Sequence, residues 1–207
     1  MRPTPPPALV RTRTFTPLDA LRPRLALRND LTASGSRAWI TPGFGASTAY
    51  ISLSPGLVCV FDSPECSGLT HQQIGKLGAS AHMAWNAAAR ALRTTAVRAT
   101  GIEFHVRPAS VALGPAAPEG VEVRGLDSPP ASWLAHPLTF ATINAHFAAV
   151  WDTQSPLTYY SRDQRELFVF TSPEDEVVAL LGARGVLRYS LGFPLVVKQE
   201  SAMAANL

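Results

Sequence analysis

The chain has 207 residues, of which 46% are hydrophobic and 16% are charged, so it can bury a sizeable core. This composition excludes a largely disordered protein, and no apolar run approaches the roughly 18 to 20 residues that a membrane-spanning helix needs. The formal net charge of +3 divides unevenly, because residues 1–40 carry seven arginines and two aspartates while the remaining residues carry 11 basic and 13 acidic side chains. We therefore expect a soluble, cytoplasmic protein with a mildly acidic body, and we do not expect nucleic acid as a partner.

The N-terminal segment is rich in proline and arginine, with six prolines among the first 23 residues. Proline has no backbone amide donor and restrains the residue before it, so we expect little regular structure there. The sequence thus predicts an arm over residues 1–36 and a globular body over residues 37–207. The arm either extends into solvent or docks against the body or an acidic partner, and its start lacks the apolar core of a secretory signal.

A β-hairpin and a long helix are predicted next. Residues 48–53 and 57–62 are rich in β-branched and aromatic side chains and flank a Pro-Gly turn, which is typical of a hairpin. Thr70 and Gln73 then form a capping-box pattern, and apolar residues recur at helical spacing as far as Leu92. This pattern predicts a single helix that ends near residue 94.

The middle of the chain is predicted to hold short strands and two helices. Residues 102–107 and 121–126 have the composition of strands and are separated by a loop rich in glycine and proline. Ser128 followed by proline indicates a helix start, Pro137 should end or kink this helix, and a second helix is expected from about Thr139.

The C-terminal third is predicted to contain a second hairpin, a helix and two more strands. The segments LTYY and ELFVF flank a polar turn, SRDQR, and Ser172 with Pro173 indicates the start of a helix that stops near Gly182 or Gly185. Strands are expected at about 186–190 and 194–199.

Two short segments of the sequence are nearly identical, as an internal duplication would produce. Residues 60–65 (VFDSPE) and 169–174 (VFTSPE) agree at five of six positions, and each follows a hairpin and precedes a helix and a strand. The alternative is that Phe-x-Ser-Pro-Glu is an efficient way to leave a strand and begin a helix. We expect an α+β fold in which two ββαβ halves, duplicated or independent, span residues 47–108 and 156–199 and are connected by helices over residues 128–151. The helices should pack on an antiparallel or mixed sheet, and a cleft between the halves is the expected place for a ligand.

Small residues form a second face on the predicted long helix. Gly78, Ala79, His82 and Asn86 lie on this face, and small side chains let another backbone approach closely. His82 and Asn86 could hydrogen-bond across such a contact, which favours a homodimer or a protein partner, or they could line a shallow ligand pocket.

A polar cluster surrounds the turn of the last predicted hairpin. It contains Tyr159, Tyr160, Ser161, Arg162 and Asp163. We expect Arg162 and Asp163 to form a surface ion pair, and the alternative is that Arg162 contacts a carboxylate or another anion of a ligand.

The other polar residues show no catalytic or metal-binding pattern. Cys59 and Cys66 have neither the paired spacing of zinc ligands nor a redox Cys-x-x-Cys spacing, and the histidines lack metal-ligand spacing. Ser63 and Ser172 lie outside any Gly-x-Ser-x-Gly motif and are better explained as helix caps. We therefore expect no metal, no cofactor and no catalytic residue.

In residues 57–92 a strand leads through a turn to a helix that contains Ala-x-x-Ala and an asparagine, and in residues 161–170 an Arg-Asp pair precedes a strand. These segments resemble one family of uncharacterised bacterial proteins, the YtpQ type, which is known as a domain of unknown function. The resemblance covers about half of the chain. It implies no known activity and no catalytic residue.

The sequence favours a non-catalytic module that binds a protein or a small ligand. The alternative is a small hydrolase or transferase of unfamiliar type, which would use His82, Asn86 or the cluster from Tyr159 to Asp163 in a cleft between the halves. This alternative requires these side chains to converge, with hydrogen-bonded partners within about 3 Å.

Overall fold

The computed structural model describes residues 17–33, 44–125 and 128–197. Its strands form a three-stranded sheet in the order β1-β3-β2, a six-stranded sheet in the order β11-β10-β8-β9-β7-β6, and a small β4-β5 ribbon. Every strand pair is antiparallel. The predicted α+β class is confirmed, and of the two sheet types considered the antiparallel one is found. No helix within the described ranges is long and apolar enough to cross a membrane.

The three-stranded sheet contains the predicted first hairpin and one strand that the sequence did not predict. The hairpin consists of β2 (Tyr50–Ser54) and β3 (Leu57–Asp62), and β1 (Arg22–Leu27) pairs with the other edge of β3. The expectation of little regular structure in this part of the N-terminal segment is therefore wrong. β1 is an edge strand, the position in a sheet at which proline is tolerated. Residues 1–16 and 34–36 of the predicted arm lie outside the described residues.

The long helix predicted from Thr70 is two helices, α2 (His71–Lys76) and α3 (Ala81–Ala96). The Thr70 capping box is confirmed. Gly78 adopts a φ of 69°, which ends α2, and the Ser80 side chain then caps α3. Periodicity alone suggested one helix because the apolar face continues across the break. Three short helices precede these two: η1 (Pro17–Ala20), α1 (Arg28–Ala33) and η2 (Phe44–Ala46).

The middle segment forms the edge of the six-stranded sheet. The predicted strand at 102–107 is divided between β5 (Gly101–Ile102) and β6 (His105–Pro108), and the loop that follows contains a short helix. The strand predicted at 121–126 begins and ends slightly earlier. The remaining elements here are β4 (Val97–Arg98), α4 (Ser110–Leu113) and β7 (Gly120–Arg124).

The predicted C-terminal order of elements is confirmed, with two corrections at helix starts. Pro137 does not end a helix but occupies the first position of α5, and His136 caps it. Pro173, not Ser172, is the N-cap residue of α6, whose end at Gly182 is as predicted. The elements are η3 (Pro130–Leu134), α5 (Pro137–Val150), β8 (Thr158–Tyr160), β9 (Leu167–Phe170), α6 (Glu174–Leu181), β10 (Val186–Ser190) and β11 (Phe193–Val196).

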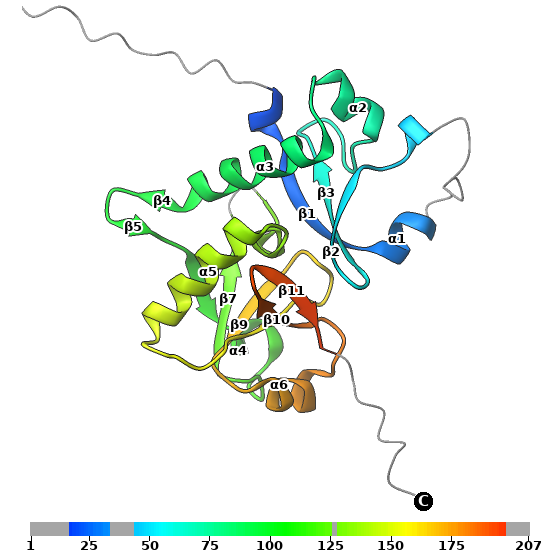
Figure 1. Ribbon diagram of the computed structural model, residues 1–207. Coiled ribbons are helices and arrows are strands. Elements are labelled where there is room, and N and C mark those ends of the chain that lie inside the picture. The colour runs from blue at the N-terminus through cyan, green and yellow to red at the C-terminus, as the bar shows by residue number, and fades with distance from the viewer. Residues whose placement is uncertain (1–16, 34–43, 126–127, 198–207) are drawn as a thin grey trace, which may run out of the picture.

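The six-stranded sheet has an apolar face on each side. Alternate residues of its central strands point toward the main core, which α3 and α5 share, and the intervening residues point toward a second core. Val177 of α6 and Ala109 before α4 belong to this second core, and α6 lies on the side of the sheet away from α3 (Figure 1). The main-core residues of β8, β9 and β10 are Tyr159, Leu167, Val169 and Leu187. The second-core residues of the same strands are Tyr160, Phe168, Phe170 and Val186.

The fold does not show the internal repeat. In the first hairpin β2 lies at the edge of its sheet, whereas β8, which holds the equivalent place in the second hairpin, also pairs with β10, the strand that follows α6. Ser63 does not cap a helix either, because its side chain accepts a hydrogen bond from the backbone N–H of Cys66 within a turn. Phe-x-Ser-Pro-Glu thus leaves a strand in both places but begins a helix in only one.

Candidate functional site

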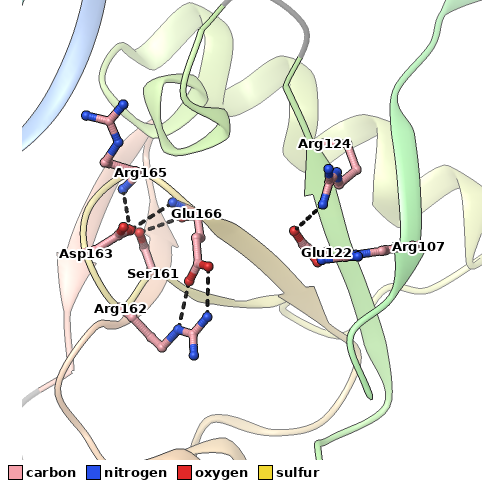
Figure 2. Close-up of polar contacts among 8 residues, drawn as sticks. All are labelled: Arg107, Glu122, Arg124, Ser161, Arg162, Asp163, Arg165 and Glu166. Atoms are coloured by element: carbon pink, nitrogen blue, oxygen red, sulfur yellow. Dashed lines mark hydrogen bonds and ion pairs between the residues drawn. The ribbon is translucent and has the colours of Figure 1, made fainter. Parts of the chain in front are cut away.

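The β8–β9 turn, residues 161–166, separates two cavities of different character. Asp163 organises the turn, because its Oδ1 accepts hydrogen bonds from the backbone N–H groups of Arg165 at 2.8 Å and Glu166 at 3.0 Å (Figure 2). Partial burial acts to raise the pKa of Asp163, but these backbone hydrogen bonds lower it below its ordinary value. Ser161 donates to the carbonyl of Glu166 at 2.5 Å, and Gln164 adopts a φ of 62°. The turn is therefore closed by its own hydrogen bonds.

Arg162 pairs with Glu166, and the predicted Arg162–Asp163 ion pair is wrong. The guanidinium of Arg162 makes two hydrogen bonds to the carboxylate of Glu166, at 2.7 and 2.8 Å. This fork geometry is the favoured one for arginine and a carboxylate. Asp163 is unavailable for it because its own carboxylate is turned toward the backbone.

On the polar side of the turn, Glu122 is held between two arginines from the sheet edge. Arg107 of β6 donates from Nε to Oε2 of Glu122 at 2.5 Å, and Arg124 donates from Nη1 to Oε1 at 3.2 Å (Figure 2). The side chain of Glu122 is 9% exposed, while those of Arg107 and Arg124 are 40% and 52% exposed. A carboxylate buried to this degree is tolerated because both of its oxygens have a cationic partner.

Glu122 and Arg124 border an open groove of about 480 Å³. Its wall carries the carboxylates of Glu122, Asp163 and Glu166 against the guanidinium groups of Arg124 and Arg165. All three carboxylates already accept hydrogen bonds within the protein. Because these carboxylates are already hydrogen-bonded to arginines or to backbone N–H groups, we interpret the groove as a surface at which ion pairs and hydrogen bonds hold neighbouring strands and the turn together.

We expect Glu122→Gln to lower the free energy of unfolding by about 1–2 kcal/mol, because the buried side chain loses its charge and one of its two acceptor oxygens while the half-exposed arginines stay solvated. The matched variant Glu166→Gln removes a more exposed ion pair and should lower it by less than about 1 kcal/mol. Urea unfolding of both variants measures the difference. Equal losses would contradict the structural role assigned to Glu122.

On the other side of the turn, an apolar pocket of about 290 Å³ opens between the two sheets. Leu27 and Leu57, which are paired across β1 and β3, form one wall, and Leu187 and Val196, which are paired across β10 and β11, form another. Leu57 and Leu187 are each only 3% exposed, so the pocket reaches the main core. The complete lining is Leu25, Leu27, Leu57, Ser161, Gln164, Ala183, Arg184, Gly185, Leu187, Val196 and Val197.

The polar rim of this pocket comes from two loops that touch each other. Gly185 adopts a φ of 89°, and its carbonyl accepts a hydrogen bond from the backbone N–H of Ser161 at 2.9 Å. A Cβ at position 185 would lie 2.4 Å from the carbonyl oxygen of Ser161. Glycine is therefore needed for the α6–β10 loop to approach the β8–β9 turn this closely. The contact fixes the positions of Arg184 and Gln164 on adjacent loops at the mouth of the pocket.

The predicted small-residue face on one helix does not exist, because Gly78 and Ala79 lie in the break between α2 and α3. Ala79 packs against the main core, and nothing lies within 4 Å of a Cβ built on Gly78. His82 and Asn86 do lie one turn apart on α3 and are exposed, and the Asn86 amide donates to the His82 carbonyl at 3.0 Å. The continuous small-residue helix face on which the predicted homodimer depends is therefore absent.

Asn86 joins α3 to the start of α5 through His136, a histidine that the sequence did not single out. Nδ1 of His136 accepts the backbone N–H of Leu138 at 2.9 Å, so in the neutral ring Nε2 carries the proton and donates to Oδ1 of Asn86 at 3.2 Å. The Trp85 ring packs on the imidazole at 4.2 Å between centroids. Burial, with a smaller contribution from Arg90, lowers the pKa of His136 to about 4. His136 therefore acts as a neutral helix cap.

The side chains named for the catalytic alternative do not form one constellation. Tyr159 is fully buried and donates to Oδ1 of Asn144 at 2.8 Å, and burial raises the pKa of its phenol above the ordinary value. His82 and Asn86 interact with residues of α3 and the α5 start instead. Within the described ranges no hydrogen bond connects the two sets, and no group of three histidine, cysteine or acidic side chains is placed to hold a metal ion.

A scan against protein-family models gives no match for this chain, and searches of curated proteins and of solved structures give no significant match either. The resemblance to the YtpQ type therefore stays a prediction. The apolar pocket between the sheets combines a buried floor with polar groups at its mouth, and this geometry makes it the candidate site.

Sequence reasoning missed several residues of this pocket, above all Arg184 and Gln164. The sequence indicates Gly185 only as a possible helix stop, and it places Leu25 and Leu27 in the predicted arm. One signal was present: two glycines, Gly182 and Gly185, follow α6 within four residues, which is more than a helix end requires. The pocket is lined by Leu57 of the predicted segment 47–108, by residues of the predicted segment 156–199, and by Leu25 and Leu27 of β1. A ligand in a cleft between these segments stays a prediction.

Proposed function

We propose that this protein is a non-catalytic small-ligand-binding protein whose ligand places an aliphatic part in the apolar pocket between the two sheets. The observation that carries the proposal is the lining of the pocket. Leucine and valine side chains from both sheets converge on a space of about 290 Å³, close to the lower end of the roughly 300–1,000 Å³ typical of ligand pockets.

The physical basis of the proposed binding is the transfer of aliphatic groups out of water. Each methylene group that moves from water into an apolar site contributes about 0.8 kcal/mol, which corresponds to about a fourfold change in Kd. Leu25, Leu57 and Leu187 at the floor are 1–3% exposed, so a chain that reaches them leaves solvent almost completely. Affinity should therefore rise with chain length until the pocket is full.

The test is isothermal titration calorimetry with octanol and decanol, which are uncharged and differ by two methylene groups. We expect decanol to bind more tightly than octanol by about fourfold per methylene. Ala183→Phe should weaken decanol binding at least tenfold, because the added ring occupies the pocket from its half-exposed wall. The matched control Ala145→Phe adds the same ring at an exposed position of α5 outside the pocket and should leave binding unchanged.

A second variant that fills the pocket keeps the test valid if Ala183→Phe does not fold correctly. Leu27→Phe enlarges the opposite wall, on β1, where the side chain is only half-buried. Circular dichroism and thermal unfolding establish that each variant is folded. Absence of decanol binding by the unmodified protein, or full binding by both folded filling variants, would overturn the proposed function.

A further inference from the structure

We propose that the ligand of the apolar pocket is an aliphatic carboxylate, with its chain on the leucine floor and its carboxylate at Arg184 and Gln164. This inference depends on the proposed function and specifies the chemical class of the ligand. It starts from the charge of the pocket. Among the described residues that line it, Arg184 is the only charged one, and no lining residue is acidic. The charge complementary to such a site is a single negative one.

The donors at the mouth of the pocket are free to bind a carboxylate. Arg184 is exposed, and neither its guanidinium nor the Gln164 side-chain amide hydrogen-bonds to another described residue. An arginine fork with a neighbouring amide presents several N–H donors to the two oxygens of one carboxylate. A dianion such as a phosphate monoester would need a second cation, which the described lining lacks.

The backbone around the mouth holds these donors in place. Gln164 has a φ of 62°, a conformation that costs free energy for a residue other than glycine, and the closed hydrogen bonding of the β8–β9 turn maintains it. Arg184 precedes Gly185, whose carbonyl is bonded to the Ser161 N–H. Because the two loops are tied together, little further ordering of the backbone is needed when a ligand binds.

The ligand class is tested by calorimetry with decanoate, decanol and decylamine at pH 7.5, which share one chain and differ in head-group charge. We expect the unmodified protein to bind decanoate about five- to tenfold more tightly than decanol, and decylamine more weakly than either. In Arg184→Gln the preference for decanoate should disappear, so that decanoate and decanol bind within about twofold of each other. Arg184→Lys keeps the charge but loses the fork and should show an intermediate preference.

The matched control is Arg188→Gln, which removes the same charge from an exposed position on β10 that does not line the pocket. It should retain the preference for decanoate. Equal affinity for decanoate and decanol in the unmodified protein, or an equal loss of preference in Arg188→Gln, would overturn the carboxylate assignment while leaving the proposed function intact. Binding of none of the three ligands would overturn the proposed function itself.

Discussion

The Gly185→Ala variant is expected to lose about 3 kcal/mol of unfolding free energy, whereas Gly182→Ala is expected to lose only about 1 kcal/mol. Both glycines follow α6 and have similar positive φ values, 89° for Gly185 and 81° for Gly182. They differ in their surroundings. A Cβ at position 182 meets nothing within 4 Å, but one at position 185 lies 2.4 Å from the Ser161 carbonyl oxygen. The first variant therefore adds a backbone collision to the conformational strain that both share.

Urea unfolding of the two variants, followed by circular dichroism, separates these contributions because the strain cancels in the comparison. A loss in Gly185→Ala that is no larger than in Gly182→Ala would mean that the α6–β10 loop can move away from the β8–β9 turn at little cost. The walls of the pocket would then be much less rigid than the contact between Gly185 and Ser161 implies.

Acid should destabilise the protein through His136 by about 2 kcal/mol between pH 7 and pH 4.5. In the folded protein the pKa of His136 is lowered to about 4, chiefly by burial and secondarily by Arg90, while in the unfolded chain it has its ordinary value of 6.5. Between these two pH values the unfolded state binds more protons, so the free energy of unfolding falls as the pH decreases. Well above pH 6.5 the histidine is neutral in both states and the effect vanishes.

The measurement compares the unmodified protein with His136→Asn at pH 7 and pH 4.5 by urea unfolding. Asparagine is a favourable N-cap residue without a titratable group, so this variant should retain the cap of α5 and lose the His136 part of the pH dependence. His146, whose pKa burial also lowers, is present in both proteins and does not affect the comparison. The same fall in stability in both proteins would show that His136 is not held in its neutral form.

Much of the secondary structure follows from local signals in the sequence. The capping box at Thr70 and the acidic first turn of α6 are local interactions, so their outcome depends little on the rest of the fold. β1 could not be predicted in this way, because a proline in a short segment indicates irregular structure. The segment forms a strand because it pairs with β3, and this long-range pairing cannot be inferred from local sequence. The division of the long helix at Gly78 was hidden by an apolar pattern that continues through the turn.

The residues that line the candidate pocket could not be predicted from the sequence. The polar turn indicates Arg162 and Asp163 as candidate ligand contacts. In the structure Arg162 pairs with Glu166, and Asp163 accepts hydrogen bonds from the turn backbone. The pocket beside the turn is built from leucines and valines, which in a sequence look like any other core residues. Its charged residue, Arg184, lies in a loop and has no distinguishing sequence pattern. Which aliphatic residues leave a space between them depends on how the two sheets meet, where β11 contacts β2, and this is set by the whole fold.

The most direct test of the proposed ligand pocket is a crystal structure of the full chain with 10-bromodecanoate, using the anomalous scattering of bromine to find the end of the chain. We expect the bromine beside Leu25 and Leu57 and the carboxylate within hydrogen-bond distance of Arg184. Bromine in the charged groove beside Glu122, or anomalous density only at the protein surface, would contradict the assignment of the pocket between the sheets as the ligand site.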